Sequence, residues 1–586
     1  MLTAIAVCVL VLSSDRVGTL AQKESAKPRE RAITGRITGE FGQPLAHVGV
    51  NVRRVGMPAS GAGMSIGTDE DGRFRADDLA PGMYSVFAYA AGYVTEADPV
   101  ERQTYRPGDV VTLRMIKGGV ISGTVTNSSG EPVIAARVSA SRVRDAEQRP
   151  IRGASPTNSR QTDDLGAFRI YGLQSGSYVV AVNGGTAYYY SSSPGGYDAD
   201  APTYYPSTTR DAAVEITVRA GEEVNGIDIK YRGERGHTVS GTLSGVIGKN
   251  PSRGVSVTLA YPTSGAIESS AYLSLRAGER GFALYGVPDG EYEIVARGNT
   301  GAENDFASAP RRVVVKGADV TGIELTLAPL GSISGRILVE PLLDSERKDA
   351  CKTKSGALLE ETVMIARRDE RANAKEQSSS GDPSYIEGAA DDKGEFKIYG
   401  LGAGRYRIEP RLPESWYVRS IMLSATQKQP DLASTGLALS SGQRVTDLTV
   451  TLAEGAAGLR GKVVPASENT SVPPRFRVHL VPAEAESADD VLRYAEAAVG
   501  GDGVFSITNL APGRYLLLAR AVTDDEFMVR TPRLVAWDAT ARTKLQRDAK
   551  AVNVVVELHR CQRLTDYVLK YQTPPDAKKR PPKTNP

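Results

Sequence analysis

One pattern of alternating apolar and polar positions occurs five times along the chain. Each copy opens with two apolar residues four positions apart, and between them lie polar residues and a glycine. Alternation with a period of two is typical of a half-buried β-strand. We therefore predict five opening strands, at residues 33–37, 121–125, 239–243, 333–337 and 459–463.

A second pattern follows each opening strand: a turn, then Phe, then Gly eight residues later, then Tyr after two more. Five of the ten Phe residues occupy this position: Phe74, Phe168, Phe282, Phe396 and Phe505. The matching tyrosines are Tyr84, Tyr178, Tyr292, Tyr406 and Tyr515. Phe and Tyr should supply most of a small core, with the Tyr hydroxyl needing a hydrogen-bond partner at its edge.

In three copies the turn before Phe reads Asp-x-x-Gly, at residues 69–72, 163–166 and 391–394. Asp can accept a backbone N–H of its own turn, and Gly adopts the positive φ that closes it. Two carboxylates at such a turn fall short of the six to eight oxygen ligands of calcium. We therefore interpret these segments as turns and predict no metal site.

The combination of a Gly-containing first strand with Asp-x-x-Gly-x-Phe-x-Ile-x-x-Leu-x-x-Gly-x-Tyr resembles the carboxypeptidase regulatory-like domain. That family is similar to collagen-adhesin B-type repeats and starch-binding-like modules. The resemblance covers nearly all of residues 31–558, although the third copy lacks the turn Asp and the fifth has it displaced to Asp502. It implies an all-β chain of five tandem Ig-like (transthyretin-like), antiparallel, seven-stranded sandwiches, arranged as beads on a rod.

Short Gly-rich linkers between the copies favour semi-rigid spacing of the sandwiches. The expected boundaries follow from these linkers and from the composition of the two ends. They are 1–21 for a signal peptide, 31–117, 118–233, 236–329, 330–454 and 455–558 for the sandwiches, and 559–586 for a disordered, basic, Pro-rich tail.

The signal peptide is expected because residues 2–12 are apolar except for Thr3 and because Thr19, Leu20 and Ala21 offer a small-x-small cleavage site. No Lys or Arg precedes the apolar run, which departs from the usual pattern. The run is too short for the ~20 residues that span a bilayer. We therefore expect an extracytoplasmic protein without a transmembrane segment in the mature chain.

Beyond the expected signal peptide only Cys351 and Cys561 remain, 210 residues apart. They could pair in an oxidising compartment, but sequence separation does not show proximity. Two unpaired thiols are the simpler expectation.

Charge and motifs exclude several classes of function. Lys and Arg (71) nearly balance Asp and Glu (69), so nucleic acid or an anionic membrane is not an expected partner. None of the four His residues begins a His-x-x-Glu, and neither a Gly-x-Ser-x-Gly elbow nor a phosphate-binding loop is present. An intramolecular isopeptide bond would need a Lys at a fixed position of each opening strand. Only the fifth copy has a Lys there, Lys462. We therefore expect no enzyme and no cofactor.

One aromatic cluster lies outside the repeated cores, and sugars stack on exposed aromatic faces. It could form a glycan-binding site, or it could fold back and pack on its own sheet. The residues are Tyr188, Tyr189, Tyr190, Tyr197, Tyr204 and Tyr205. The predicted function is thus a non-enzymatic envelope scaffold, adhesion or presentation protein with a protein or polysaccharide partner. A carbohydrate-binding array is the alternative.

Overall fold

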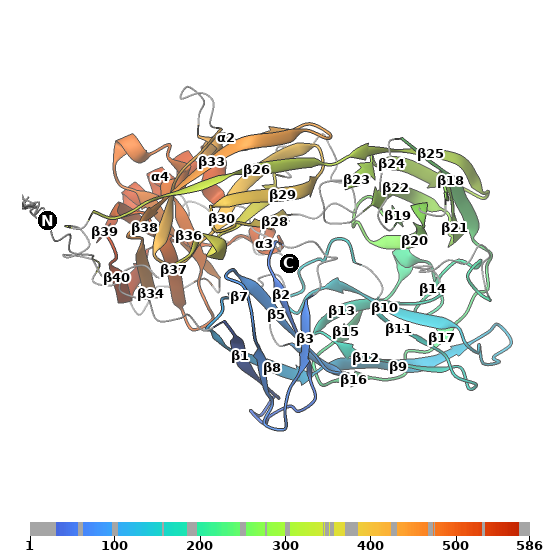
Figure 1. The fold of residues 1–586 in the computed structure, drawn as a ribbon. Helices are drawn as coiled ribbons and strands as arrows, with labels where there is room; N and C mark the ends of the chain where they lie inside the picture. Colours follow the sequence, from blue (N-terminus) through green and yellow to red (C-terminus); the bar gives the residue numbers. More distant parts are fainter. Residues whose placement is uncertain are drawn as a thin grey trace, which may run out of the picture.

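In the computed structural model the chain forms five β-sandwiches in sequence order (Figure 1). This confirms the all-β sandwich fold. No helix in the described part of the chain is both long and apolar enough to cross a membrane. The residues described are 31–572, without 57–62, 96–102, 155–156, 184–195, 246–253, 276–277, 299–304, 344, 346–350, 352–356, 370–384, 424–430, 467–472, 474 and 530–533.

The first three sandwiches consist of short strands with few helical turns. The first contains β1 (Ile33–Thr38), β2 (Gly49–Arg54), β3 (Met64–Gly67), β4 (Arg73–Ala76), β5 (Tyr84–Tyr89), β6 (Tyr93–Thr95), β7 (Thr104–Tyr105) and β8 (Val110–Lys117). The second contains β9 (Gly119–Thr126), β10 (Arg137–Arg144), β11 (Thr157–Gln161), β12 (Ala167–Leu173), β13 (Gly176–Val182), β14 (Thr203–Tyr204), η1 (Arg210–Ala212), β15 (Ile216–Val218), β16 (Glu223–Val224) and β17 (Ile229–Lys230). The third contains β18 (His237–Gly245), β19 (Val255–Ala260), β20 (Ile267–Leu273), β21 (Gly281–Val287), β22 (Gly290–Gly298), β23 (Phe306–Ser308), β24 (Arg311–Val315) and β25 (Val320–Pro329).

The last two sandwiches carry most of the helical segments. The fourth contains β26 (Gly331–Glu340), η3 (Leu359–Glu361), β27 (Val363–Arg368), β28 (Tyr385–Ala389), β29 (Glu395–Leu401), β30 (Gly404–Arg411), β31 (Trp416–Leu423), α2 (Leu432–Thr435), β32 (Leu437–Leu439) and β33 (Arg444–Glu454). The fifth contains β34 (Ala457–Pro465), β35 (Phe476–Pro482), η4 (Ala485–Ser487), η5 (Val491–Arg493), β36 (Ala495–Ala498), β37 (Val504–Leu510), β38 (Gly513–Ala521), α3 (Asp524–Phe527), η6 (Val535–Trp537), α4 (Ala539–Val552), β39 (Val554–Leu558) and β40 (Arg563–Tyr571).

Each sandwich places its opening strand between the strand that carries the signature Phe and its own last strand. In the first sandwich β1 pairs antiparallel with β4 and parallel with β8. The same parallel pair recurs in the other four, so the expectation of purely antiparallel sandwiches is corrected. The described strands number seven in the fifth sandwich and eight or nine in the others, where the sequence predicted seven throughout.

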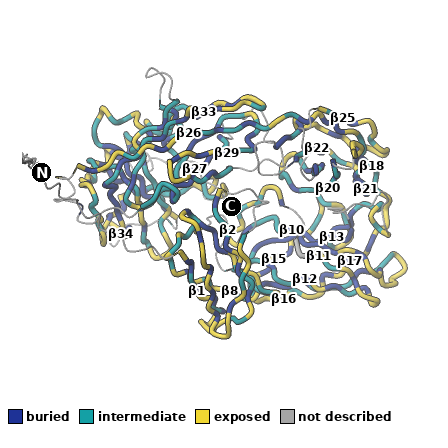
Figure 2. Tube along the Cα trace, in the orientation of Figure 1, coloured by how far each residue is buried: buried dark blue, intermediate teal, exposed yellow. Residues whose placement is uncertain are grey.

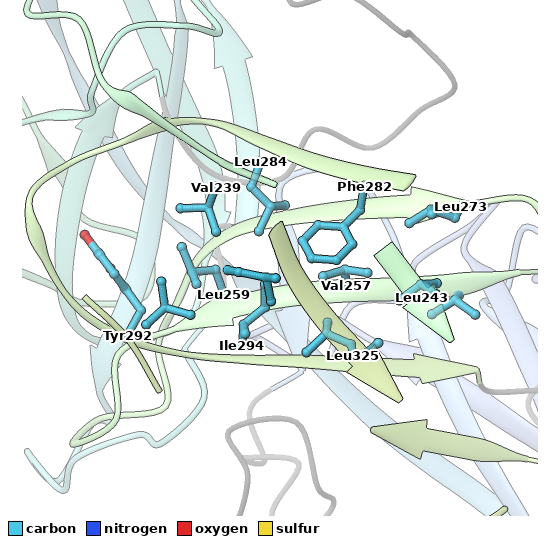
Figure 3. Close-up of a cluster of buried hydrophobic side chains, with 14 of the residues drawn as sticks. Val239, Leu243, Val257, Leu259, Leu273, Phe282, Leu284, Tyr292, Ile294 and Leu325 are labelled. Atoms are coloured by element: carbon cyan, nitrogen blue, oxygen red, sulfur yellow. The ribbon is translucent and has the colours of Figure 1, made fainter. Parts of the chain in front are cut away.

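The Phe and Tyr of the repeated signature are buried in all five sandwiches, as predicted. Each Tyr hydroxyl donates a hydrogen bond to the carbonyl four residues earlier, which closes the loop that carries the signature Gly. In the third sandwich the Tyr292 hydroxyl points away from the apolar cluster (Figure 3). The five bonds are Tyr84 to Ala80 (2.9 Å), Tyr178 to Gln174 (2.7 Å), Tyr292 to Pro288 (2.9 Å), Tyr406 to Gly402 (2.9 Å) and Tyr515 to Ala511 (2.6 Å).

The glycine of each opening strand is required because the last strand passes directly over it. A Cβ at any of these positions would overlap a backbone carbonyl oxygen of the neighbouring parallel strand or of the segment that leads into it. The pairs are Gly35 with Val111, Gly123 with Ile227, Gly241 with Ile323, Gly335 with Leu448 and Gly461 with Tyr567. The repeated Gly therefore sets the distance between the first and last strands.

Two features near the C-terminal end differ from the sequence prediction. Strand β40 pairs with β34, so the fifth sandwich extends to Tyr571, and residues 559–571 are not a disordered tail. The helix α4, which the sequence analysis did not predict, is capped by the Asp538 carboxylate accepting from Ala541 N–H and ends at Asn553 with positive φ. It packs against the outer face of the sheet that contains β35 and β38.

The five sandwiches do not form a straight rod, because the chain folds back on itself at the third sandwich (Figure 1). Val55 of the first sandwich packs against Val363 and Ile365 of the fourth. Arg106 and Glu361 form an ion pair of 3.5 Å across the same contact. In Figure 2 the buried residues run through each sandwich, so five small cores, and not one shared core, support this arrangement. The linkers are as short as predicted, with only Gly118 between β8 and β9 and only Leu330 between β25 and β26.

Candidate functional site

Three of the six predicted Tyr residues are described, and all three pack on the second sandwich. The Tyr197 ring lies edge-on to Tyr231 with centroids 5.7 Å apart, and Tyr205 contacts the same core. Tyr204 is buried. Tyr188, Tyr189 and Tyr190 lie outside the described residues. The described half of this segment therefore packs against the sheet instead of presenting ring faces to solvent.

Tyr204 also takes part in a buried polar cluster between the second and third sandwiches. Its hydroxyl donates to Glu268 of β20 at 3.4 Å, and Arg210 donates to the same hydroxyl at 3.3 Å. The Arg210 guanidinium lies 4.9 Å from the ring centroid of Tyr261, which itself packs on the signature Tyr292 at 5.2 Å. This cluster joins the two sandwiches through aromatic, cationic and carboxyl groups.

Burial dominates the electrostatics of this junction. It raises the pKa of the Glu268 carboxyl, although Tyr261, Arg210 and Tyr204 each act in the opposite direction. It also raises the pKa of Tyr204 and Tyr261. Glu268 was not predicted as a functional residue, because the sequence of β20 looks like that of any strand. Its partners Tyr204 and Arg210 come from another sandwich.

The four histidines lie in four different environments in the structure. His479 is buried in β35, its Nδ1 lies 3.3 Å from Glu496, and its Nε2 accepts a hydrogen bond from Arg520 at 3.4 Å. Burial lowers the pKa of His479. Burial alone would raise the pKa of Glu496, but contacts with His479 and Arg477 outweigh it and lower that pKa. Glu496 also accepts a hydrogen bond from the Val535 N–H, so this series of polar contacts links η6 to the sheet.

The remaining histidines contact isolated carboxylates or solvent. His47 is exposed with Glu70 at 3.4 Å, and His559 is an exposed turn residue. His237 lies 3.1 Å from Asp289 and 4.0 Å from Asp319. Within the described residues no three His, Cys, Asp or Glu side chains are grouped as metal ligands.

The Asp-x-x-Gly segments form the turns that the sequence predicts. Asp69 accepts hydrogen bonds from Asp71 N–H at 3.0 Å and Arg73 N–H at 2.7 Å, and Gly72 has a φ of 70°. The equivalent turns at Asp163 and Asp391 have the same bonds. Since one carboxylate oxygen of each Asp accepts two backbone N–H groups, the conserved position of Asp within the turn has a structural explanation.

A disulfide joins Cys351, in the long insertion of the fourth sandwich, to Cys561, in the turn before β40. The expectation of two unpaired thiols is therefore wrong. The contact between the fourth and fifth sandwiches places the two Cα atoms 5.5 Å apart despite the separation of 210 residues. Neighbouring contacts hold the same interface, since Asn509 donates to the carbonyls of Pro413 and Trp416, both at 2.7 Å.

Three solved structures show a distant similarity to the chain. A minor pilin of Streptococcus agalactiae matches with 15% identity and a TM-score of 0.19, over 35% of this chain and 96% of its own. Two B repeat units of the collagen binding protein of Staphylococcus aureus match with 12% identity and a TM-score of 0.13, over 72% of this chain and 99% of theirs. The Bacillus anthracis TIE protein matches with 10% identity and a TM-score of 0.15, over 90% and 75%. At these scores the likeness carries no conclusion about function.

No curated protein sequence matches the chain. Residues 32–115, however, match the sequence profile of the carboxypeptidase regulatory-like domain. That segment begins just before β1 and ends within β8, so it comprises nearly the whole first sandwich. The family resemblance drawn from the repeated signature is thus confirmed for the first sandwich, which is similar to the carboxypeptidase regulatory-like domain over nearly its whole length.

Proposed function

We propose that the chain is an exported, non-enzymatic scaffold of the bacterial envelope, which holds its loops in a fixed arrangement for presentation or adhesion. The disulfide between Cys351 and Cys561 is the observation that carries this proposal. Structural disulfides persist in oxidising compartments and are rare in the cytosol. Cys351 is itself buried, which suits a structural bond better than a reactive thiol.

The contacts between sandwiches support a rigid scaffold in preference to a flexible tether. The interface of the fourth and fifth sandwiches combines the disulfide with a cation–π contact of 5.5 Å between Arg407 and Trp537. On the opposite side of the fold, backbone bonds join the second and third sandwiches, for example Gly153 N–H to the Ser264 carbonyl at 2.9 Å. Since inter-domain motion is the default for chains with small interfaces, such links are what a fixed presentation surface requires.

The environments of the polar groups favour a structural role over catalysis. A general base must reach a substrate proton, and a nucleophile must lie beside a base. His479 has both ring nitrogens engaged, with Glu496 and Arg520, and is almost fully buried. Glu268 is likewise buried at the sandwich junction, where it accepts a hydrogen bond from the Tyr204 hydroxyl.

Location and disulfide state test this proposal together. Cells that make the chain are fractionated, and the chain is alkylated before and after reduction. We expect it outside the cytoplasm, with Cys351 and Cys561 protected until reduction. A cytoplasmic chain with both thiols free would refute the proposal.

Carbohydrate binding stays the alternative and rests on Tyr188, Tyr189 and Tyr190. A polysaccharide pull-down compares the intact chain with the triple Tyr→Ala variant at these positions. Tyr89→Ala is the control, because Tyr89 is 77% exposed on the first sandwich and outside the segment. Loss of binding in the triple variant alone would establish a glycan site, whereas no binding by the intact chain would exclude it.

A further inference from the structure

Among the described residues, the last strand of the fifth sandwich has one unpaired edge, whereas the corresponding edge is covered in each of the other four sandwiches. In the first, third and fourth sandwiches a strand after the signature Tyr pairs with the outer edge of the last strand: β6 on β8, β23 on β25 and β31 on β33. In the second, Lys230 N–H donates to the Pro206 carbonyl at 3.1 Å, and Ser207 donates to the Lys230 carbonyl. Each of these edges therefore has hydrogen-bond partners within the chain.

In the fifth sandwich the corresponding segment does not return to the sheet. After β38 the chain forms α3, η6 and α4, and α4 packs on the outer face of the other sheet. The sheet that contains the opening strand is left with the order β37-β34-β40, and among the described residues β40 pairs with β34 alone. Figure 1 places β40 at the end of the molecule that lies away from the third sandwich.

The residues of β40 suit pairing with a further strand. Tyr567, Leu569 and Tyr571 face the core, while Val568 is 59% exposed on the outer face. β-Branched and aromatic residues favour strands, and an exposed edge of this kind is a template for another chain. Residues 573–586 contain five Pro, which cannot donate to a ladder, so the segment that follows β40 is a poor strand to cover it.

We propose that β40 pairs antiparallel with β40 of a second copy of this chain, so that the two three-stranded sheets form one six-stranded sheet. Counted from a Val568–Val568 pair at the two-fold axis, Asp566 lies opposite Lys570 of the second copy. Asp566 has a φ of 59° and stands at the β-bulge where β40 shifts register against β34, so this pair lies at the end of the regular part of the strand. The two-fold axis repeats this pair, so the interface contains two pairs of opposite charges. Asp566 and Lys570 are both exposed in the single chain, which leaves them available for this contact. Opposite charges across an antiparallel pair stabilise it, and like charges there destabilise it.

The symmetry of the register provides the test. Val568→Lys places two Lys residues opposite one another, and Val568→Asp places two Asp residues there. We expect light scattering during size exclusion to give twice the chain's mass for the purified wild-type chain. Each variant alone should dissociate with a dissociation constant raised about ten-fold or more, since like charges directly opposite one another across an antiparallel pair destabilise it.

An equimolar mixture of Val568→Lys and Val568→Asp chains should recover the dimer, which also shows that both variants fold. Val110→Lys is the matched control, because Val110 is 76% exposed on the equivalent last strand β8 of the first sandwich. It should leave the dimer unchanged. A monomeric wild-type chain, dimeric single variants, or a mixture that stays monomeric would each overturn the proposal.

A charge exchange checks the register independently. Lys570→Asp should weaken the dimer, and the double variant Asp566→Lys with Lys570→Asp should restore it. If the double variant stays as weak as the single variant, the proposed register is wrong.

Discussion

The substitution Gly241→Ala tests whether the opening-strand glycine sets the spacing of the first and last strands. Gly241 lies in β18, and a Cβ there would be 1.8 Å from the carbonyl oxygen of Ile323 in β25. Side-chain Cβ atoms essentially never approach another atom within 3.0 Å, so the two strands must separate by more than 1 Å. A backbone hydrogen bond lengthened by that amount is lost.

The cost follows from the bonds that this displacement breaks. Two or three ladder bonds contribute about 0.5–1.5 kcal/mol each, and overpacking of a filled core adds about 1–3 kcal/mol. Since the strands relax partly, we expect about 2–4 kcal/mol of lost stability for the third sandwich, which is a ~30- to 1000-fold increase in its opening constant. The other four sandwiches have their own cores and should change little.

Hydrogen exchange followed by mass spectrometry measures this effect sandwich by sandwich. Gly281→Ala is the matched control in the same sheet, because the nearest atom to a Cβ there is the Gly241 carbonyl oxygen at 3.9 Å. In the control we expect unchanged or slightly slower exchange, since Ala reduces the freedom of the unfolded chain. Equal exchange of residues 237–329 in both variants would refute the argument.

Three further predictions concern the core, the disulfide and the sandwich junction. Tyr292→Phe leaves the Pro288 carbonyl without its donor and should destabilise the third sandwich by about 1–2 kcal/mol, measured by the same exchange experiment. Cys351→Ser should leave all five sandwiches folded but speed exchange at the interface of the fourth and fifth, because a disulfide restrains chiefly by closing a loop. Glu268 has a raised pKa, so its contribution to stability is complete below its unfolded value of about 4.5 and is lost as pH rises through the folded value. Once the intrinsic pH dependence of amide exchange is divided out, the junction of the second and third sandwiches should therefore be less protected at neutral than at acid pH, and Glu268→Gln should remove that difference in protection.

Each of these has an outcome that would contradict it. For Tyr292→Phe it is exchange no faster than in Tyr89→Phe, since Tyr89 is exposed and its hydroxyl lies outside the repeated core. For Cys351→Ser it is global unfolding, or no change at the interface. For Glu268 it is a pH dependence of the corrected protection that survives the substitution to Gln.

Local features of this chain were predictable from sequence, and long-range ones were not. The opening strands, the buried Phe and Tyr and the Asp turns depend on neighbours within a few residues, and all lie where the pattern placed them. The carbonyl acceptors of the Tyr hydroxyls also lie only four residues away and could have been proposed from the sequence. The helix α4 offered a signal too, in Asp538 at its start and Asn553 at its end.

Contacts between sandwiches could not be predicted from any comparable pattern in the sequence. The disulfide spans 210 residues, and the pair of Arg106 and Glu361 forms only because the chain turns back at the third sandwich. The packing of Tyr204 likewise depends on Glu268 from the next sandwich. A single sequence gives the alternation within a strand, but not which outer faces meet.

The parallel pairing of first and last strands has a consequence for the order in which the chain is completed during synthesis. An opening strand such as β1 must wait for β8 before its sheet can close, so each sandwich is finished only when its final residues emerge. Sequential units of this kind fold as they are made, from the N-terminus onward. Cys561 lies two residues before the start of β40. The covalent bond to Cys351 can thus form only as the last strand arrives, and it locks the final fold once all five cores exist.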